Sequence, residues 1–410
     1  MVEPQPAPDA DRPSAGVRAL VVLFWVFASA IFVWNHLVLP YRIEGVDYGK
    51  HWIASGRILA GESPYTGELF LSFNYPLFIA FIYAPLAFVT HETGERIFDA
   101  LNFLMMSGAA AFLICGLRPR RESGREWMHD FWGPLVVLFF AVNNSVRRLM
   151  WSGNVDGLNV LLLCAFMTLL IRGKERWAGL ALGAVVLVKV APVLFFLPVF
   201  ALRKWRCLAV GLGVIALYWL LLFATGWARI ETQLFREVLP GIPWFWRHIS
   251  LSFHNVVAEF GWGWDNISEH GYRRLVLVVN AVMMLALCAV VWLRWRVVGD
   301  STERVMILSY QWLIAFVPLL EMIHVSWVLP ALFVGLRAWT ERRLPTMLML
   351  PWLLSWAILV HIDIFGQFFA LWADVGLHPH HFMTMIVALS LAAVTVYTLQ
   401  PRAASEGPQP

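Results

Sequence analysis

Four ionisable side chains stand beside long apolar segments of this sequence and are the first candidates for chemistry. Asp47 follows the first apolar segment, Lys189 interrupts another one beside Pro192, and Glu321 and His324 lie three residues apart between two more. A charged group near membrane depth is costly unless it faces water, a partner or a substrate. A carboxylate can accept a hydroxyl proton, and a lysine can bind an anion. The plainer alternatives are a capping or surface aspartate and a lysine that snorkels to the interface.

The composition places these residues in a membrane protein. The chain has 410 residues, of which 60% are hydrophobic and only 14% charged, and its apolar residues fall in long runs. This pattern is typical of a polytopic helical membrane protein and excludes an ordinary soluble domain. No P-loop, dinucleotide or zinc-finger motif occurs, so nucleotide and nucleic-acid functions find no support. The four cysteines have neither metal-ligand spacing nor a disulfide pattern and are interpreted as small core residues.

The apolar runs predict one all-α integral-membrane domain over residues 19–399, between disordered cytoplasmic tails at 1–18 and 400–410. At roughly twenty residues per crossing, the sequence predicts about twelve spans. Basic clusters between the runs place both termini in the cytoplasm and residues 45–91 and 227–272 in outer loops. The predicted spans are residues 19–39, 97–117, 132–150, 155–171, 177–202 as two short helices, 207–226, 275–293, 305–320, 325–339, 344–362 and 382–399.

Three places do not fit a simple succession of spans. Residues 75–89 are apolar but short, which favours a re-entrant or interfacial helix in the first outer loop. Residues 177–202 keep both basic ends inside only if they form a hairpin broken near Lys189 and Pro192, and a buried lysine there needs a partner. Arg147 and Arg148 fall outside, so they either contact an anionic ligand or mark a wrong boundary.

An ordered set of short motifs resembles glycosyltransferase family 87, whose members are membrane-embedded enzymes of the GT-C class. Each motif alone is weak, but their order and spacing run from about Asp47 to Leu336. The chain departs from the family pattern at Leu77, His51-Trp52 and Gly153. The motifs are Asp47-Tyr48, Pro64-Tyr65, Asn74-Tyr75-Pro76, Ala84-Pro85-Leu86, Gly153-Asn154-Val155 with Asn159, residues 178–183, Lys189-Val-Ala-Pro192, residues 203–206, Ser250-Leu251-Ser252 with Asn255, and residues 321–324.

The resemblance implies an integral-membrane glycosyltransferase with a polyprenyl-phosphate-sugar donor, mannose or arabinofuranose being the expected sugars. The acceptor would be a lipid-linked or cell-envelope glycan on the extracytoplasmic side of the plasma membrane. Asp47 is the predicted general base, because the acceptor hydroxyl must lose a proton as its oxygen attacks. Lys189, Arg247 and His248 are predicted to bind the donor phosphate. The predicted substrate-binding residues are His51, Tyr65, Asn74, Tyr75, Asn154, Asn255, Glu321 and His324.

No cofactor is expected to be required. A carboxylate–imidazole pair such as Glu321 and His324 falls short of a closed metal site, which leaves a catalytic divalent cation open. The alternative function is a transporter or flippase for a lipid-linked sugar. The ionisable residues favour the enzyme, because they collect on the outer face instead of spreading across the membrane depth.

Overall fold

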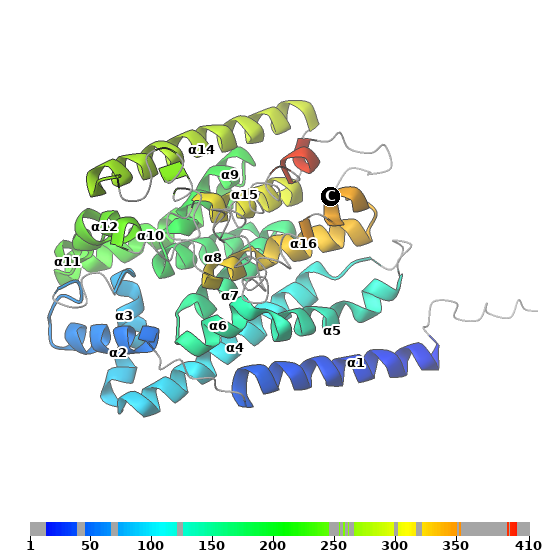
Figure 1. Ribbon diagram of the computed structural model, residues 1–410, viewed down its shortest axis with the longest axis horizontal. Coiled ribbons are helices and arrows are strands. Elements are labelled where there is room, and N and C mark those ends of the chain that lie inside the picture. The colour runs from blue at the N-terminus through cyan, green and yellow to red at the C-terminus, as the bar shows by residue number, and fades with distance from the viewer. Residues whose placement is uncertain are drawn as a thin grey trace, which may run out of the picture.

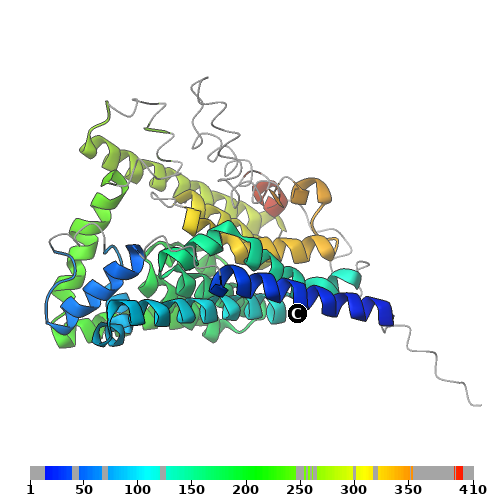
Figure 2. The same ribbon diagram turned by 60° about the horizontal axis from the view of Figure 1, so that its bottom comes forward.

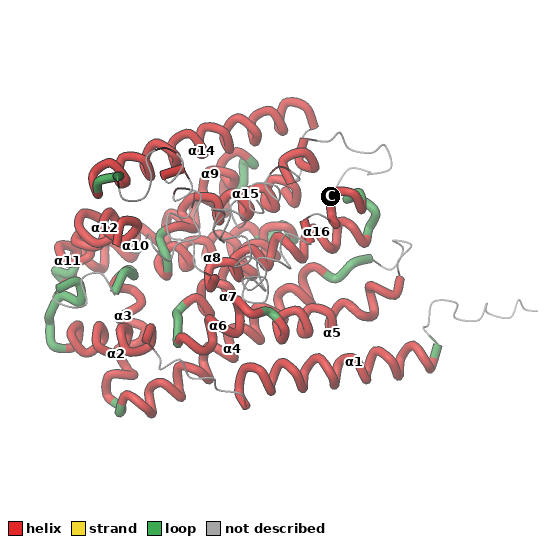
Figure 3. Tube along the Cα trace, viewed as in Figure 1, coloured by secondary structure: helices red, strands yellow, loops and turns green. Residues whose placement is uncertain are grey.

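The computed structural model describes a helical chain. Its described residues are 14–38, 46–66, 73–120, 126–245, 254, 257–258, 261, 266–298, 302–316, 322–350, 352–353, 392 and 394–399. Within them every regular element is a helix and no strand occurs, as Figure 3 shows. The all-α prediction is therefore confirmed for the described part of the chain.

Within the described residues, four helices are long and apolar enough to cross a membrane. They are α1 (Ala15–Val33) with its π-helical extension η1 (Trp34–Val38), α4 (His91–Leu117), α10 (Trp205–Thr225) and α14 (Glu269–Val298). Their ends carry ordinary helix-capping residues. Ser14 and Thr90 cap α1 and α4 with their side chains, and Gly226 ends α10 with φ +82°. The predicted total of about twelve spans goes beyond these four and stays a prediction.

Large apolar side chains cover the outside of these helices. Leu23 of α1 is 65% exposed, and Phe223 of α10 and Leu285 of α14 are also exposed. Contiguous apolar surface of this kind is unfavourable in water but suits a hydrocarbon environment. The exposed faces therefore agree with a membrane-embedded protein.

The remaining helices build the interior of the bundle and one of its ends. They are α2 (Val46–Leu59), α3 (Leu77–Tyr83), η3 (Ala84–Phe88), α5 (Glu126–Val142), α6 (Asn144–Ser152), α7 (Asp156–Ile171), α8 (Glu175–Val188), η5 (Ala191–Phe195), α9 (Phe196–Ala201), α11 (Ala228–Gln233), η6 (Leu234–Val238), α12 (Leu239–Phe245), α15 (Thr302–Phe316), η7 (Met322–Val328) and α16 (Leu329–Thr340).

The two predicted outer loops meet at one end of the molecule. In Figures 1 and 2, α2 and α3 lie at the same end as α11 and α12. A separate apolar core joins the two groups through buried residues such as Leu77 and Leu234. Ser63 also donates a hydrogen bond of 2.8 Å to Gln233. Residues 77–88 form the short helical pair α3 and η3, and their placement as a re-entrant or interfacial segment stays a prediction.

The predicted hairpin at Lys189 is confirmed. Helix α8 ends at Val188, Lys189 has extended backbone angles, and η5 and α9 follow. The chain then returns to the level at which α8 began, because Lys204 lies 3.8 Å from Glu175. Helices α8 and α10 pack in direct backbone contact, since a Cβ on Gly179 would lie 2.4 Å from the carbonyl oxygen of Cys207. Both helices therefore start on the same side of the molecule.

The predicted single span over residues 132–150 is wrong. The chain forms two helices there, α5 and α6, which are separated at Asn143. The break has a local cause, because the Asn143 side chain accepts a hydrogen bond of 3.1 Å from Val146 N and so caps a new helix. Arg147 and Arg148 belong to this second helix, where Arg147 lies 4.2 Å from the centroid of the Trp151 ring. The predicted boundary is therefore wrong at this place, and contact of the two arginines with an anionic ligand stays a prediction.

Candidate functional site

Asp47 lies in the first turn of α2 with each carboxylate oxygen engaged. Lys50 donates to Oδ1 at 2.9 Å, and Asn154 Nδ2 donates to Oδ2 at 3.0 Å. Burial alone would raise the pKa of Asp47. The charge and hydrogen bond of Lys50, with the hydrogen bond of Asn154, outweigh burial and hold that pKa below its usual value. The side chain keeps 18% of its surface exposed. Asp47 is thus an ionised and accessible carboxylate held in a fixed orientation.

Asn154 connects Asp47 to the start of α7. Its Oδ1 accepts a hydrogen bond of 3.0 Å from Asp156 N, while its Nδ2 serves Asp47. Its backbone carbonyl accepts a further bond from Asn102 Nδ2 of α4. The amide is therefore oriented at both ends, and it fixes the position of the Asp47 carboxylate relative to α7.

Gly153 allows α2 to approach this connection closely. Its φ of +64° ends α6 in the left-handed region, and an added Cβ would lie 2.7 Å from Tyr48 Cβ. Tyr48 is the neighbour of Asp47, so any side chain at position 153 would displace the turn that carries the carboxylate.

We expect Gly153→Ala to lower kcat/KM for glycosyl transfer about 10-fold to 100-fold, because a displacement near 1 Å can have this effect. Gly173→Ala is the matched control, since Gly173 has φ +70° but nothing within 4 Å of an added Cβ. Both variants carry the same backbone strain of about 1–2 kcal/mol. Equal activity of the two variants would contradict the role assigned to the Gly153–Tyr48 contact.

Lys189 is surrounded by a second cluster. Its Nζ lies 2.8 Å from Asp156 Oδ2 and 2.9 Å from His324 Nε2. The same ammonium group lies 5.4 Å from the centroid of the Tyr75 ring and 5.0 Å from that of Trp327. An ammonium group has three N–H donors, and two of them face Asp156 and His324. The Lys189 side chain keeps 15% of its surface exposed.

Asp156 was not among the site residues predicted from the sequence. Its side chain is completely buried, and it supplies the counter-ion that a buried lysine needs. The sequence does contain a signal for a functional role of this residue. Asp156 is an acid at the start of a long apolar run, directly after Gly153-Asn154-Val155. The structure brings His324 to this cluster from η7, in agreement with the predicted convergence of Lys189 and His324.

The Asp47 and Lys189 clusters share one electrostatic environment. The charge of Asp47 acts on Asp156, and the charges of both Asp47 and Lys189 act on His51. The chain also links them over a short distance, because Asn154 contacts Asp47 and Asp156 contacts Lys189. A carboxylate and a cation therefore lie at two neighbouring positions of one site.

His51 and Tyr65 lie beneath this site instead of facing into it. Burial lowers the pKa of His51 to about 3, so the ring is neutral. The ring packs 4.8 Å from Tyr75 and stacks on Phe98. The Tyr65 hydroxyl donates to the Tyr75 carbonyl at 2.7 Å and lies 3.3 Å from Glu231 Oε2. These contacts indicate support of the segment around Tyr75.

The other predicted site residues differ in how far the structure describes them. Asn74 is half-buried and immediately precedes Tyr75, whose ring faces Lys189. Arg247, His248, Asn255 and Glu321 lie outside the described residues, so their predicted contacts stay predictions. Among the described residues, no group of three or more His, Cys, Asp or Glu side chains is arranged to hold a metal ion.

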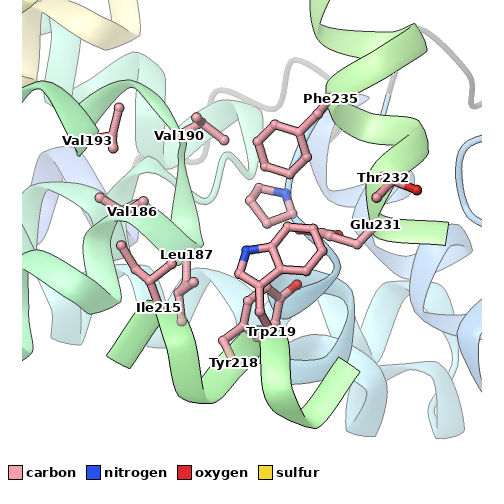
Figure 4. A pocket seen from close by; sticks show the side chains of 11 residues that line it. Val186, Leu187, Val190, Val193, Ile215, Tyr218, Trp219, Glu231, Thr232 and Phe235 are labelled. Carbon is pink, nitrogen blue, oxygen red and sulfur yellow. The ribbon is translucent and has the colours of Figure 1, made fainter. Parts of the chain in front are cut away.

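An apolar pocket of about 370 Å³ lies next to the Lys189 cluster (Figure 4). Val190, which follows Lys189, and Pro76, which follows Tyr75, both contribute to its wall. In Figure 4 the Trp219 and Phe235 rings lie beside each other at one side, close to Glu231. The remaining lining residues are Val186, Leu187, Val193, Ile215, Tyr218 and Thr232. The pocket offers an apolar molecule one carboxyl group and little other polar surface.

Comparisons with known proteins show what this chain is similar to. A polyprenol-phosphate-mannose-dependent alpha-(1-2)-phosphatidylinositol mannoside mannosyltransferase of Mycobacterium tuberculosis is 24% identical over 397 residues, which cover 91% of this chain and 86% of the relative. An alpha-(1->3)-arabinofuranosyltransferase of Corynebacterium glutamicum is 30% identical over 131 residues, or 32% of this chain and 29% of the relative. The family model of glycosyltransferase family 87 matches residues 73–320, more than half of the chain. The chain therefore belongs to glycosyltransferase family 87 and is a glycosyltransferase.

Proposed function

We propose that this protein transfers a mannosyl or arabinofuranosyl group from a polyprenyl-phosphate donor to a lipid-linked or cell-envelope glycan. The observation that carries the proposal is that the accessible Asp47 carboxylate and the Lys189 ammonium group belong to one electrostatic environment, connected through Asn154 and Asp156. Mannose is favoured, because the relative that aligns along most of the chain has a name that specifies polyprenol-phosphate-mannose.

In the proposed reaction, Asp47 accepts the proton of the acceptor hydroxyl while the hydroxyl oxygen attacks the anomeric carbon. The bond between that carbon and the phosphate oxygen breaks, and its electron pair stays on the polyprenyl phosphate. Lys189 donates a hydrogen bond to this developing charge, and His324 lies beside it. A single displacement of this kind inverts the anomeric carbon. The step itself consumes no cofactor, and dependence on a divalent cation is an open prediction.

The apolar pocket provides room for the first isoprene units of the donor. Its wall contains Val190, which follows Lys189, and Pro76, which follows the Tyr75 ring beside Lys189. A lipid phosphate bound to Lys189 would therefore place its isoprenoid chain in this pocket. Burial of the isoprenoid chain supplies binding free energy at about 25 cal/mol per Å² of apolar surface. We further propose that the chain is a multi-pass plasma-membrane protein of about twelve spans. Its site would open to the extracytoplasmic face.

The test uses the purified full-length chain in detergent with radiolabelled polyprenyl-phosphate mannose or arabinofuranose and a panel of glycolipid acceptors. Labelled acceptor is expected with one donor, together with free polyprenyl phosphate. In sealed vesicles, movement of the donor across the bilayer without labelled acceptor would instead identify a flippase. That second result would overturn the proposed function.

A further inference from the structure

The N-terminus of α3 is capped by side chains from a distant part of the chain. Its own preceding residue, Pro76, makes no side-chain cap, so the first N–H groups of the helix need other acceptors. Glu231 Oε2 accepts from Leu77 N at 2.9 Å, and the Tyr218 hydroxyl accepts from Phe78 N at 3.1 Å. Helices α10 and α11 thereby hold the first turn of α3.

Glu231 is an unusual residue for its surroundings. Its side chain is 1% exposed and belongs to the wall of the apolar pocket. Burying a carboxyl group among apolar side chains is unfavourable unless hydrogen bonds compensate. Leu77 N, the Tyr65 hydroxyl and the Tyr218 hydroxyl supply these bonds from three segments. The contacts converge on one carboxyl group that plays no part in the proposed reaction.

These contacts fix the segment that reaches the cation. Glu231 contacts Leu77 on one side of Tyr75, and through the Tyr65 hydroxyl it is linked to the Tyr75 carbonyl. The Tyr75 ring lies against both Lys189 and His51. A loss of Glu231 would therefore release the backbone that holds this ring against the ammonium group.

We propose that Glu231 is a positioning residue for glycosyl transfer, which holds α3 and Tyr65 so that Tyr75 stays against Lys189 and orients its ammonium group toward the donor phosphate. This inference rests on the proposed function, since it assigns Lys189 to the donor. The positioning role requires an acceptor oxygen at position 231 and does not require a negative charge there. Glutamine should therefore replace glutamate there, whereas alanine should not.

The test compares Glu231→Ala, Glu231→Gln and the control Glu237→Ala, which removes an exposed acid from the neighbouring turn. Turnover is measured with polyprenyl-phosphate mannose as the varied substrate. Glu231→Ala is expected to lower kcat/KM for the donor about 10²-fold, chiefly through kcat, because the donor is bound but misplaced. Glu231→Gln and Glu237→Ala should stay within about threefold of wild type.

Hydrogen exchange of the amides of residues 77–83 gives a readout that needs no turnover. Exchange there should accelerate in Glu231→Ala and stay unchanged in the other two variants. An active wild type with a fully active Glu231→Ala, or a Gln variant as impaired as the Ala variant, would overturn the positioning role alone. A wild type that transfers sugar from no polyprenyl-phosphate donor would overturn the proposed function and this role with it.

The protonation of Glu231 gives a separate prediction on stability. Burial raises the pKa of Glu231 from 4.5 to about 7, against the opposing hydrogen bonds of Leu77 N and the two tyrosine hydroxyls. A raised pKa in the folded state means that its contribution to stability is complete below pH 4.5 and lost as the pH rises through 7. The wild-type Tm should therefore fall by a few degrees relative to that of Glu231→Gln between pH 5 and pH 8. A Tm difference between wild type and Glu231→Gln that does not change with pH would contradict the burial of this carboxyl group.

Discussion

An Asp47→Asn protein is expected to fold, insert into the membrane and lose glycosyl transfer by about 10³-fold, the usual contribution of a general base. The amide has nearly the shape of the carboxylate, but its single oxygen can accept from only one of the two donors, Lys50 or Asn154. It cannot accept the acceptor proton. Because the lost interaction belongs to the transition state, kcat should fall while the donor KM changes little. Initial rates with saturating polyprenyl-phosphate mannose measure the effect.

Glu62→Gln is the control for this experiment. Glu62 follows α2 as an exposed acid 4.0 Å from Arg57, and its neutralisation should leave turnover within about twofold. A Tm equal to that of wild type shows that the Asp47→Asn protein is folded. Wild-type turnover in Asp47→Asn would remove Asp47 from the mechanism and would leave the reaction without the base assigned here.

Replacing Lys189 with methionine is expected to affect stability and donor binding together. Asp156 would remain buried without its counter-ion, and breaking such a pair destabilises a protein by about 3–5 kcal/mol. The donor phosphate would lose a charge-assisted hydrogen bond, which corresponds to a rise in donor KM of about 10-fold to 100-fold. Thermal unfolding in detergent and donor titrations measure the two effects separately.

A double variant separates these two roles of Lys189. Lys189→Met combined with Asp156→Asn removes the unpaired charge, so most of the lost stability should return while the donor KM stays high. Recovery of donor binding together with stability would show that Lys189 acts only as a partner of Asp156. The acceptor KM serves as an internal control and should change little in either protein.

The features predicted best from the sequence are those that one local pattern determines. Pro192 and the mid-run Lys189 predicted the break after α8, because a proline and a buried charge cannot both continue an apolar helix. The shortness of residues 75–89 predicted a segment that does not cross the bundle. The sequence reasoning placed Lys189 and His324 on the same face, but it did not predict their direct contact, which joins residues 135 positions apart.

The features that the sequence did not reveal depend on contacts between distant segments. Asn143 looks like any polar residue in an apolar run until its side chain is seen to cap α6. Asp156 and Glu231 are single acids whose partners come from other helices. No spacing rule connects positions 231 and 77, because only the packing of α11 against the first outer loop brings them together.

The close contact between α8 and α10 fixes the position of Lys189 relative to α10. An added Cβ on Gly183 would lie 2.8 Å from the carbonyl oxygen of Gly211, and Lys189 lies six residues beyond Gly183, or about 9 Å along a helix. The packing register of α8 against α10 therefore determines where the ammonium group of Lys189 lies. Inserting one helical turn of residues between Gly183 and Lys189 would move the ammonium group by about 5.4 Å. In the proposed function the lipid chain holds the donor headgroup at a fixed height, so the headgroup would no longer meet the ammonium group of Lys189.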